Sequence, residues 1–184
     1  MVRKPVVKEF QKEKALHNCF SCMVELGIEQ SSMRDFSRVT GLSASSLYYW
    51  FDCKEQIVID AVQQELESIV KIIFSCASSE IGDFSSFLRK LPNIIKDYKK
   101  QLRTIIQVST SPQYGDKLVE FVNGFDKNFD RYAAELSRYT DIDYNVLRVL
   151  VDVCISSVVT YVVWDNQEKF IREIENHLKM TKFK

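Results

Sequence analysis

Hydroxyl groups are concentrated in one short stretch of the sequence, between residues 43 and 49. The stretch contains Ser43, Ser45, Ser46, Tyr48 and Tyr49, and Lys54 follows shortly afterwards. Serine and tyrosine hydroxyls both donate and accept hydrogen bonds. Lys54 stands at the predicted start of a helix, where an ammonium group and free backbone N–H groups together bind phosphate. The chemistry of this stretch is therefore that of binding a polar surface rather than of breaking bonds.

Sequence motifs for catalysis and for metal binding are missing. The sequence contains no His-Glu-x-x-His, no Gly-x-Ser-x-Gly and no phosphate loop, and its two histidines, His17 and His177, lie far apart. Cys19 and Cys22 have a C-x-x-C spacing, but a zinc ion needs four ligands and no second pair follows. We therefore interpret them as small core residues and predict no catalytic residue, metal site or cofactor, and no enzyme activity.

The composition is that of a helical protein without a strong overall charge. Of the 184 residues 46% are hydrophobic and 27% are charged, and Lys+Arg and Asp+Glu both total 25. Residues 1–54 hold eight basic and six acidic side chains, which leaves +2 there and −2 in the remainder. A globally basic protein is excluded, but a local basic face is not. Five glycines and three prolines are few, which favours long helices over strands and turns.

The predicted location is the cytoplasm, without a membrane partner. The first residues lack the apolar segment of a secretory signal, and five cysteines, an odd number, are typical of free thiols in a reducing compartment. Residues 146–164 are apolar enough to raise the question of a membrane span. Arg148 and Asp152 within them are costly in lipid, so we predict a buried helix.

The first third of the chain predicts short helices separated by capped turns. Apolar residues recur at helical spacing over 8–26, and Gly27 follows at the position that favours a left-handed C-cap. Ser32 and Asp35 form an acidic variant of the capping box, and the helix that they start ends before Gly41. Ser43 is a good N-cap for the next helix. Two short helices around a glycine turn predict a helix-turn-helix.

The remainder of the chain predicts larger helices. Residues 84–98 form one apolar helical face, which Pro92 is expected to kink or divide. Residues 118–136 form the clearest amphipathic stripe. Residues 144–165 are rich in valine and isoleucine, but their polar residues fall four apart, which indicates a helix. A last helix follows over 168–180, so the predicted fold class is all-α.

The residues from Lys8 to about Ala61 resemble the N-terminal DNA-binding domain of the TetR (tetracycline repressor) family. The matching positions are Gly27, Ser32-Met33-Arg34-Asp35-Phe36-Ser37, Gly41-Leu42-Ser43, Leu47-Tyr48-Tyr49-Trp50-Phe51 and Lys54-Glu55. The resemblance covers about a third of the chain and holds its spacing without gaps. It implies a three-helix DNA-binding domain over 1–54 and a helical effector-binding and dimerisation domain over 55–184.

The resemblance implies that the helix after Ser43 lies in the DNA major groove. Its leading turn is built of small residues, which allows close approach to base edges. Tyr48 also has a structural alternative, packing on the following helix. The predicted DNA-binding residues, including an N-terminal arm, are Arg3, Lys4, Arg34, Ser43, Ala44, Ser45, Ser46, Tyr48, Tyr49, Trp50 and Lys54.

The chain departs from the family pattern in ways that affect sequence recognition. Trp50 stands where the family often has histidine, so a phosphate contact is replaced by an indole N–H or lost. Between Ser43 and Tyr49 there is no Arg, Lys, Asn or Gln to form a bidentate base contact. We hypothesise that specificity depends on Arg34 at a guanine, on methyl contacts from Ala44 and Tyr48, and on DNA shape.

The resemblance also implies a homodimer that binds a palindromic operator. Residues 144–165 and 168–180 suit this interface, because the first of them is apolar on nearly all sides. The alternative is a central core helix in a monomer.

An unknown small-molecule effector is expected in the C-terminal domain. The aromatic residues that could line its pocket are Phe84, Phe87, Tyr98, Phe121, Phe125, Phe129 and Tyr132. An aromatic stripe at helical spacing can equally be plain core. Two hypotheses follow: a dimeric, effector-responsive transcriptional regulator, most often a repressor in this family, or a helical adaptor protein that keeps the helix-turn-helix without effector-regulated DNA binding.

Overall fold

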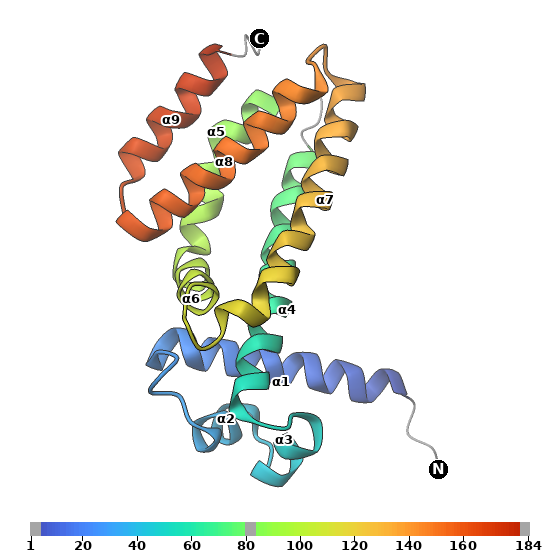
Figure 1. Cartoon of the computed structure of the whole chain (residues 1–184), viewed down its shortest axis with the longest axis vertical. Coiled ribbons are helices and arrows are strands. Elements are labelled where there is room, and N and C mark those ends of the chain that lie inside the picture. The colour runs from blue at the N-terminus through green and yellow to red at the C-terminus, as the bar shows by residue number, and fades with distance from the viewer. Residues whose placement is uncertain (1–4, 80–83, 181–184) are drawn as a thin grey trace. The chain divides into compact units, whose positions relative to one another are not determined.

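The computed structural model describes residues 5–79 and 84–180, which form nine α-helices and confirm the predicted all-α class (Figure 1). The predicted arm residues Arg3 and Lys4 lie outside the described residues. The chain divides into two compact units: Met1–Ser68 with Thr104–Val119, and Ile69–Arg103 with Glu120–Lys184. The division predicted from sequence, between residues 54 and 55, stays a prediction.

The first unit is built on α1 (Pro5–Leu26), α2 (Met33–Thr40), α3 (Ala44–Trp50) and the first part of α4 (Lys54–Ser79). Helix α2 packs against both α1 and α3. The fully buried side chains of these helices include Phe20, Met23, Phe36, Leu47, Phe51 and Ile57. Cys19 and Cys22 also lie in this core, as predicted, and burial raises the pKa of the Cys19 thiol to about 12.

Local sequence explains where these short helices begin and end. Gly27 and Gly41 have φ values of +89° and +70°, the left-handed conformation in which glycine avoids steric strain. Ser32 accepts a hydrogen bond from the Asp35 N–H, and the Asp35 carboxylate accepts one from the Ser32 N–H, so the predicted capping box is present. Ser43 caps α3 by accepting from the Ser46 N–H at 3.1 Å, which confirms that prediction.

A tight turn joins α6 (Lys99–Ser109) to α7 (Gly115–Tyr139) within the first unit. The Gly115 N–H donates to the Ser111 carbonyl at 2.8 Å. A Cβ at position 115 would lie 2.8 Å from the backbone oxygen of Ser109, closer than real contacts allow. The turn therefore requires glycine, and beside it the side chain of Tyr114 is buried.

The second unit contains α5 (Phe84–Asp97), α8 (Tyr144–Trp164) and α9 (Gln167–Met180). Helix α9 packs on both α8 and α5, and Figure 1 shows α8 and α9 side by side and antiparallel. Pro92 was expected to kink or divide its helix; the division is wrong, because α5 continues through it, and the kink stays a prediction. The chain turns after Asp97 instead, where the Tyr98 N–H donates to the Ile95 carbonyl at 3.1 Å.

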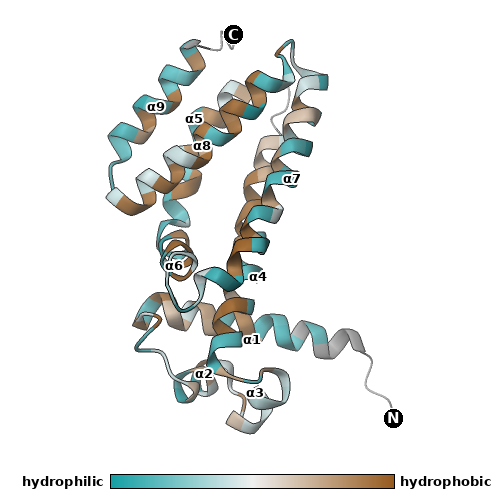
Figure 2. Ribbon diagram, viewed as in Figure 1, coloured by the Kyte–Doolittle hydropathy of each residue, from teal (hydrophilic) through white to brown (hydrophobic). Residues whose placement is uncertain are grey.

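Helix α8 is predominantly apolar, with brown stretches interrupted by paler and teal positions (Figure 2). Of the helices that the structure describes, α8 is the one that is long and apolar enough to cross a membrane. Only 28% of its most apolar 18-residue stretch is buried inside the subunit. Its C-terminus is capped: Asp165 adopts φ 57°, and Arg103 donates to the Val162 carbonyl at 2.8 Å. Arg148 and Asp152 lie within it, in the ion-pair cluster described below.

Candidate nucleic-acid interface

Helix α3 has one buried face and one exposed face. Leu47 and Phe51 are buried in the core of the first unit, whereas Tyr48 and Tyr49 are 53% and 73% exposed. The backbone of α3 is held at both ends, by the Ser43 cap and by the Phe51 N–H, which donates to the Leu47 carbonyl at 2.9 Å. An exposed, rigidly held helix is the geometry that a recognition element requires.

The serines at the start of α3 form one hydrogen-bonded group. The Ser43 hydroxyl lies 2.8 Å from the hydroxyls of both Ser45 and Ser46. Ser43, Ala44 and Ser45 are exposed, and Ser46 is half-buried. The leading turn thus presents small groups whose orientation is already fixed, so that a large molecular surface can approach its backbone closely.

The two arginines of α2, Arg34 and Arg38, differ in whether they have a partner within the protein. Arg38 donates to the Asp35 carboxylate at 2.9 Å and is committed to an ion pair. The Ser32 hydroxyl lowers the pKa of the Asp35 carboxyl, and the positive charges of Arg38 and Arg34 act in the same direction. Arg34 is exposed and forms no hydrogen bond or ion pair with the residues that the structure describes. Its guanidinium remains available to an external anion or base.

Lys54 has an internal role that the sequence did not predict. Its Nζ donates to the Ile28 carbonyl in the α1–α2 loop at 2.9 Å, which ties the start of α4 to that loop. An ammonium group has three donors, so two remain for an external acceptor. Trp50, half-buried, meets the Phe51 ring edge-on with centroids 6.4 Å apart.

The α6–α7 segment adds residues to this region that sequence reasoning missed. Lys117 forms an ion pair with Glu55, at the start of α4, at 3.0 Å. Burial raises the pKa of Tyr114, and the nearby charges of Glu29 and Glu55 act in the same direction. No local pattern signals these contacts, because the partners lie far apart in sequence.

The predicted ligand-pocket residues fall into separate groups in the second unit. Phe84 stacks on Phe87 within α5, at 5.7 Å between centroids, and Tyr98 lies between α5 and α6. The four aromatic residues of α7 that were predicted to line the pocket form a continuous row, which also includes Phe74 of α4. Its successive ring contacts join Phe121, Phe125, Phe129, Phe74 and Tyr132. Phe74 was not predicted, because it belongs to another helix.

The predicted dimer helix, α8, leaves an apolar strip exposed. Its exposed large apolar residues are Val146, Val149, Val159, Val163 and Trp164, and α9 adds Ile171. Val149 is 60% exposed and Trp164 76%. Side chains of this kind on one helix face favour a further protein surface against them.

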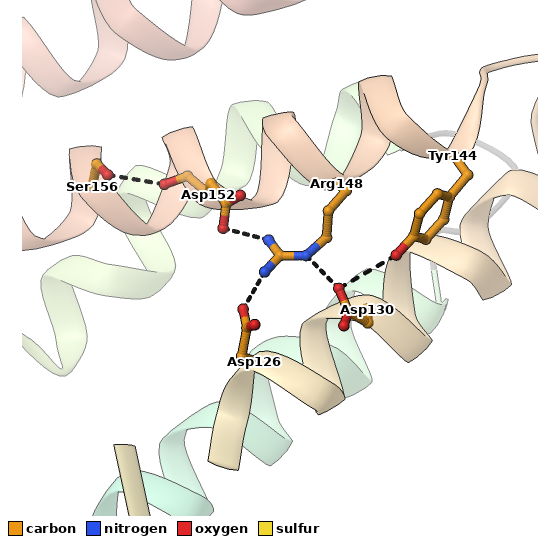
Figure 3. Close-up of polar contacts among 6 residues, drawn as sticks. All are labelled: Asp126, Asp130, Tyr144, Arg148, Asp152 and Ser156. Carbon is orange, nitrogen blue, oxygen red and sulfur yellow. Dashed lines mark hydrogen bonds and ion pairs between the residues drawn. The ribbon is translucent and has the colours of Figure 1, made fainter. Parts of the chain in front are cut away.

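An ion-pair cluster links α7 to α8 (Figure 3). Arg148 projects from α8 and donates to Asp130 at 2.6 Å, and it also pairs with Asp126 of α7 and Asp152 of its own helix. These hydrogen bonds, to Asp130 first, raise the pKa of the guanidinium. Tyr144 donates to Asp130 at 3.3 Å. The described residues contain no group of three or more His, Cys, Asp or Glu side chains suited to a metal ion.

The sequence matches no protein-family model and no curated protein. The structure, in contrast, is similar to those of several regulators, some of which are described as members of the TetR family. A TetR transcription regulator from Haloarcula marismortui aligns with TM-score 0.65 at 14% identity, over 95% of this chain and 97% of that one. The fatty acid degradation regulator FadR from Bacillus halodurans aligns with TM-score 0.63 at 16% identity, over 98% and 97%.

A third similar structure is the transcriptional regulator FadR from Bacillus subtilis in complex with stearoyl-CoA. It aligns with TM-score 0.58 at 18% identity, over 94% of this chain and 97% of that one. At these identities the likeness establishes the fold: the chain has the all-helical architecture of TetR-family regulators over nearly its whole length.

Proposed function

We propose that the protein is a dimeric, sequence-specific DNA-binding regulator that acts as a repressor in the cytoplasm and has no enzyme activity. The single observation that carries this proposal is the exposed, capped helix α3, which projects Tyr48 and Tyr49 from a buried base of Leu47 and Phe51. A helix of this kind fits the major groove of B-DNA. The TetR-like fold supports the same function, since it is shared with known transcriptional regulators.

In this proposal the small residues Ser43 to Ser46 approach the base edges and the tyrosines contact the backbone and thymine methyl groups. Arg34, the α2 cation without an internal partner, contacts a guanine or a phosphate. Trp50 and the free donors of Lys54 complete the phosphate contacts, and the arm residues Arg3 and Lys4 add to them.

Dimerisation through α8 and α9 brings two copies of α3 to a palindromic operator. The exposed valines of α8 support this interface, because the subunit itself covers only a small part of that helix. The partner that we propose for this strip is a second copy of the chain.

The effector that we propose binds in the second unit and changes operator affinity. The stearoyl-CoA complex of the Bacillus subtilis regulator makes long-chain acyl-CoA thioesters the first compounds to test. An effector acts by binding one conformation of the dimer more tightly than another, which shifts the population that can bind DNA.

The test is a gel shift with the DNA upstream of the gene, in the presence of excess unrelated DNA. We expect a specific complex whose affinity falls about a hundredfold between about 50 and 200 mM salt, as for a dimer that contacts about four phosphates. Ala44→Glu should abolish binding because it places a carboxylate at the DNA surface without harming the first turn of α3. Ser78→Glu, in an exposed part of α4, is the matched control.

A helical adaptor protein is the second candidate function. It is favoured by the shortage of available cations, since Arg38 and Lys54 both have internal partners. Absence of a specific, salt-sensitive complex in the gel shift would support the adaptor and reject the regulator.

A further inference from the structure

The exposed residues of α8 form a stripe with the spacing of a coiled-coil seam. Apart from Tyr144, Val146 and Trp164 near the helix ends, the exposed residues follow one another at alternating steps of four and three. This spacing keeps one face of a helix against a neighbouring helix. The stripe, which we call the α8 seam, consists of Asn145, Val149, Asp152, Ser156, Val159 and Val163.

The centre of the α8 seam is polar, whereas the positions on either side of the centre are apolar. Asp152 and Ser156 lie between Val149 and Val159. The Asp152 side chain is 56% exposed, and the Ser156 hydroxyl donates to the Asp152 carbonyl at 3.0 Å (Figure 3). A carboxylate in the middle of an apolar seam opposes burial unless a cation accompanies it.

Arg148 supplies that cation from within the subunit. Its guanidinium pairs with Asp152 and also with Asp126 and Asp130 of α7 (Figure 3). The arginine side chain is only 16% exposed, so it is already largely out of solvent before any second surface arrives. Because α7 holds the guanidinium beside Asp152, the charge of Asp152 stays compensated when the seam is covered.

The order of residues in the α8 seam favours one way of pairing with a second copy. The stripe is symmetric about residue 154, so an antiparallel pair centred there places Val149 against the partner's Val159 and Asp152 against the partner's Ser156. A parallel pair in register would place Asp152 against the partner's Asp152, and like charges repel. An antiparallel pair shifted by seven residues in either direction would place Asp152 against a valine.

We infer that α8 pairs with α8 of a second copy in the antiparallel register centred on residue 154, and that Arg148 is the positioning residue that allows Asp152 to be buried there. The inference rests on the proposed dimer and specifies its register and its polar centre. In the pair the Ser156 hydroxyl lies against the partner's Asp152 carboxylate, and a charged acceptor forms a stronger hydrogen bond than a carbonyl.

The first test measures the dissociation constant of the dimer of the full chain by sedimentation equilibrium. Arg148→Met should raise it about a hundredfold or more, because Asp152 would be buried without a cation. Adding Asp152→Ala to Arg148→Met should return it to within about fivefold of the unsubstituted chain, since no charge is then buried. If Arg148 served only to hold α7 to α8, removing Asp152 would not restore the dimer.

Arg131→Met is the matched control, because Arg131 is an exposed arginine of α7 outside the seam. It should leave the dissociation constant unchanged. Thermal unfolding of dilute samples checks that each variant folds. Asp152 is exposed in the subunit, so the rescue by Asp152→Ala acts on the interface rather than on the subunit core.

The second test measures the register by oxidative cross-linking, read on a non-reducing gel. Val149→Cys and Val159→Cys in the same chain should give a covalent dimer, because each cysteine faces the other kind in the partner. Either substitution alone should not, since the two copies of one position lie roughly 15 Å apart along the helix axes, beyond the reach of a disulfide. The unsubstituted chain, with its five cysteines, measures the background.

Cross-linking by either single variant, no cross-linking by the double variant, a dimer unaffected by Arg148→Met, or no rescue by Asp152→Ala would each overturn the inference while the proposed dimer stands. A chain that stays monomeric at every concentration would reject both the proposed dimer and its register. A cross-linked dimer that gives no specific complex in the gel shift would reject the regulator function and leave the α8 pairing intact.

Discussion

The contacts that stabilise the helix-turn-helix segment 27–54 and those that stabilise the second unit differ in how far apart their partners lie in the sequence. Within the segment, Ser32 pairs with Asp35 and Ser43 with Ser46, each three residues apart. In the second unit, Arg148 reaches Asp130 across 18 residues, and Arg103 reaches the Val162 carbonyl across 59. The caps and turns of the short segment thus depend mainly on neighbours in sequence, although Lys54 also reaches the Ile28 carbonyl across 26 residues. The second unit depends more on residues that only folding brings together.

This difference explains why a resemblance was visible in the first third of the chain and not in the remainder. Caps and glycine turns need particular residue types at fixed spacing, because each satisfies a specific backbone group or conformation. A helical bundle needs only apolar faces of compatible shape, which many sequences provide.

The largest effect is expected in the second unit, at the exposed apolar strip of α8. If the protein dimerises as we propose, the double substitution Val149→Asp and Val159→Asp should convert the proposed dimer to a monomer, because it places unpaired charges in an apolar interface. Operator affinity should fall about a hundredfold or more as the two linked half-sites are lost. Sedimentation velocity and gel shift measure the two effects.

Val122→Asp on α7 is the control for that experiment, since Val122 is also an exposed valine but lies on another helix. A double variant that sediments as a dimer would show that α8 does not form the interface.

In the locally encoded segment, Arg34→Ala should weaken operator binding by about 1–3 kcal/mol and relax the preference at one base pair. Arg38→Ala should weaken it less, because Arg38 is already paired with Asp35. Selection of binding sites from randomised DNA, together with titrations, measures both quantities. An unchanged site profile in Arg34→Ala would refute its assignment as a base contact.

Ser32→Ala should lower the free energy of unfolding by about 1 kcal/mol through loss of the α2 cap. Urea denaturation measures the change, and Ser78→Ala in an exposed part of α4 is the comparison. Because the cap is local, the aromatic row of the second unit should keep its near-ultraviolet circular dichroism at low urea. If Ser32→Ala destabilised the second unit as well, the proposed independence of the two regions would be contradicted.

Arg148→Ala tests the long-range cluster and should cost about 0.5–1 kcal/mol, since its carboxylate partners are largely exposed and screened by solvent. Arg131→Ala, an arginine of α7 that forms no ion pair with the described residues, should change stability less. High salt should reduce the difference between the two variants, and a difference that persists in 1 M salt would point to packing instead.

The smallest effect is expected on the stability of the protein at acid pH. The pKa of Asp35 is lowered in the folded state, so its contribution to stability is present above the ordinary aspartate pKa of about 3.9 and is lost as the pH falls through the lowered value. Removing the Ser32 hydroxyl raises the folded-state pKa toward the unfolded one. The free energy of unfolding of Ser32→Ala should therefore depend less on pH below about pH 4 than that of the unsubstituted protein. The same pH dependence in both proteins would contradict this.

Much of the α1–α4 region could be predicted from residue types alone. The residues that cap or end these helices act on backbone groups only a few residues away, so their effects can be predicted from the sequence. They are Gly27, Gly41, Ser32 and Ser43. Lys54 was predicted as a phosphate ligand, which stays a prediction. Its hydrogen bond to the Ile28 carbonyl was missed, because it depends on how the α1–α2 loop folds back. Of the two outcomes predicted for Pro92, a kink or a division of the helix, the division is wrong because α5 continues through it.

The sequence by itself determined the all-α class, the caps and glycine turns of the helix-turn-helix segment 27–54, and the apolar excess of residues 144–165. Only the tertiary structure decided that Phe74 joins the α7 aromatics, that Tyr114 and Lys117 lie with the start of α4, and that the Tyr132 hydroxyl is buried without a partner. The reason is range: hydrogen bonds and dihedral preferences act between neighbours, whereas side-chain packing depends on which distant surfaces meet.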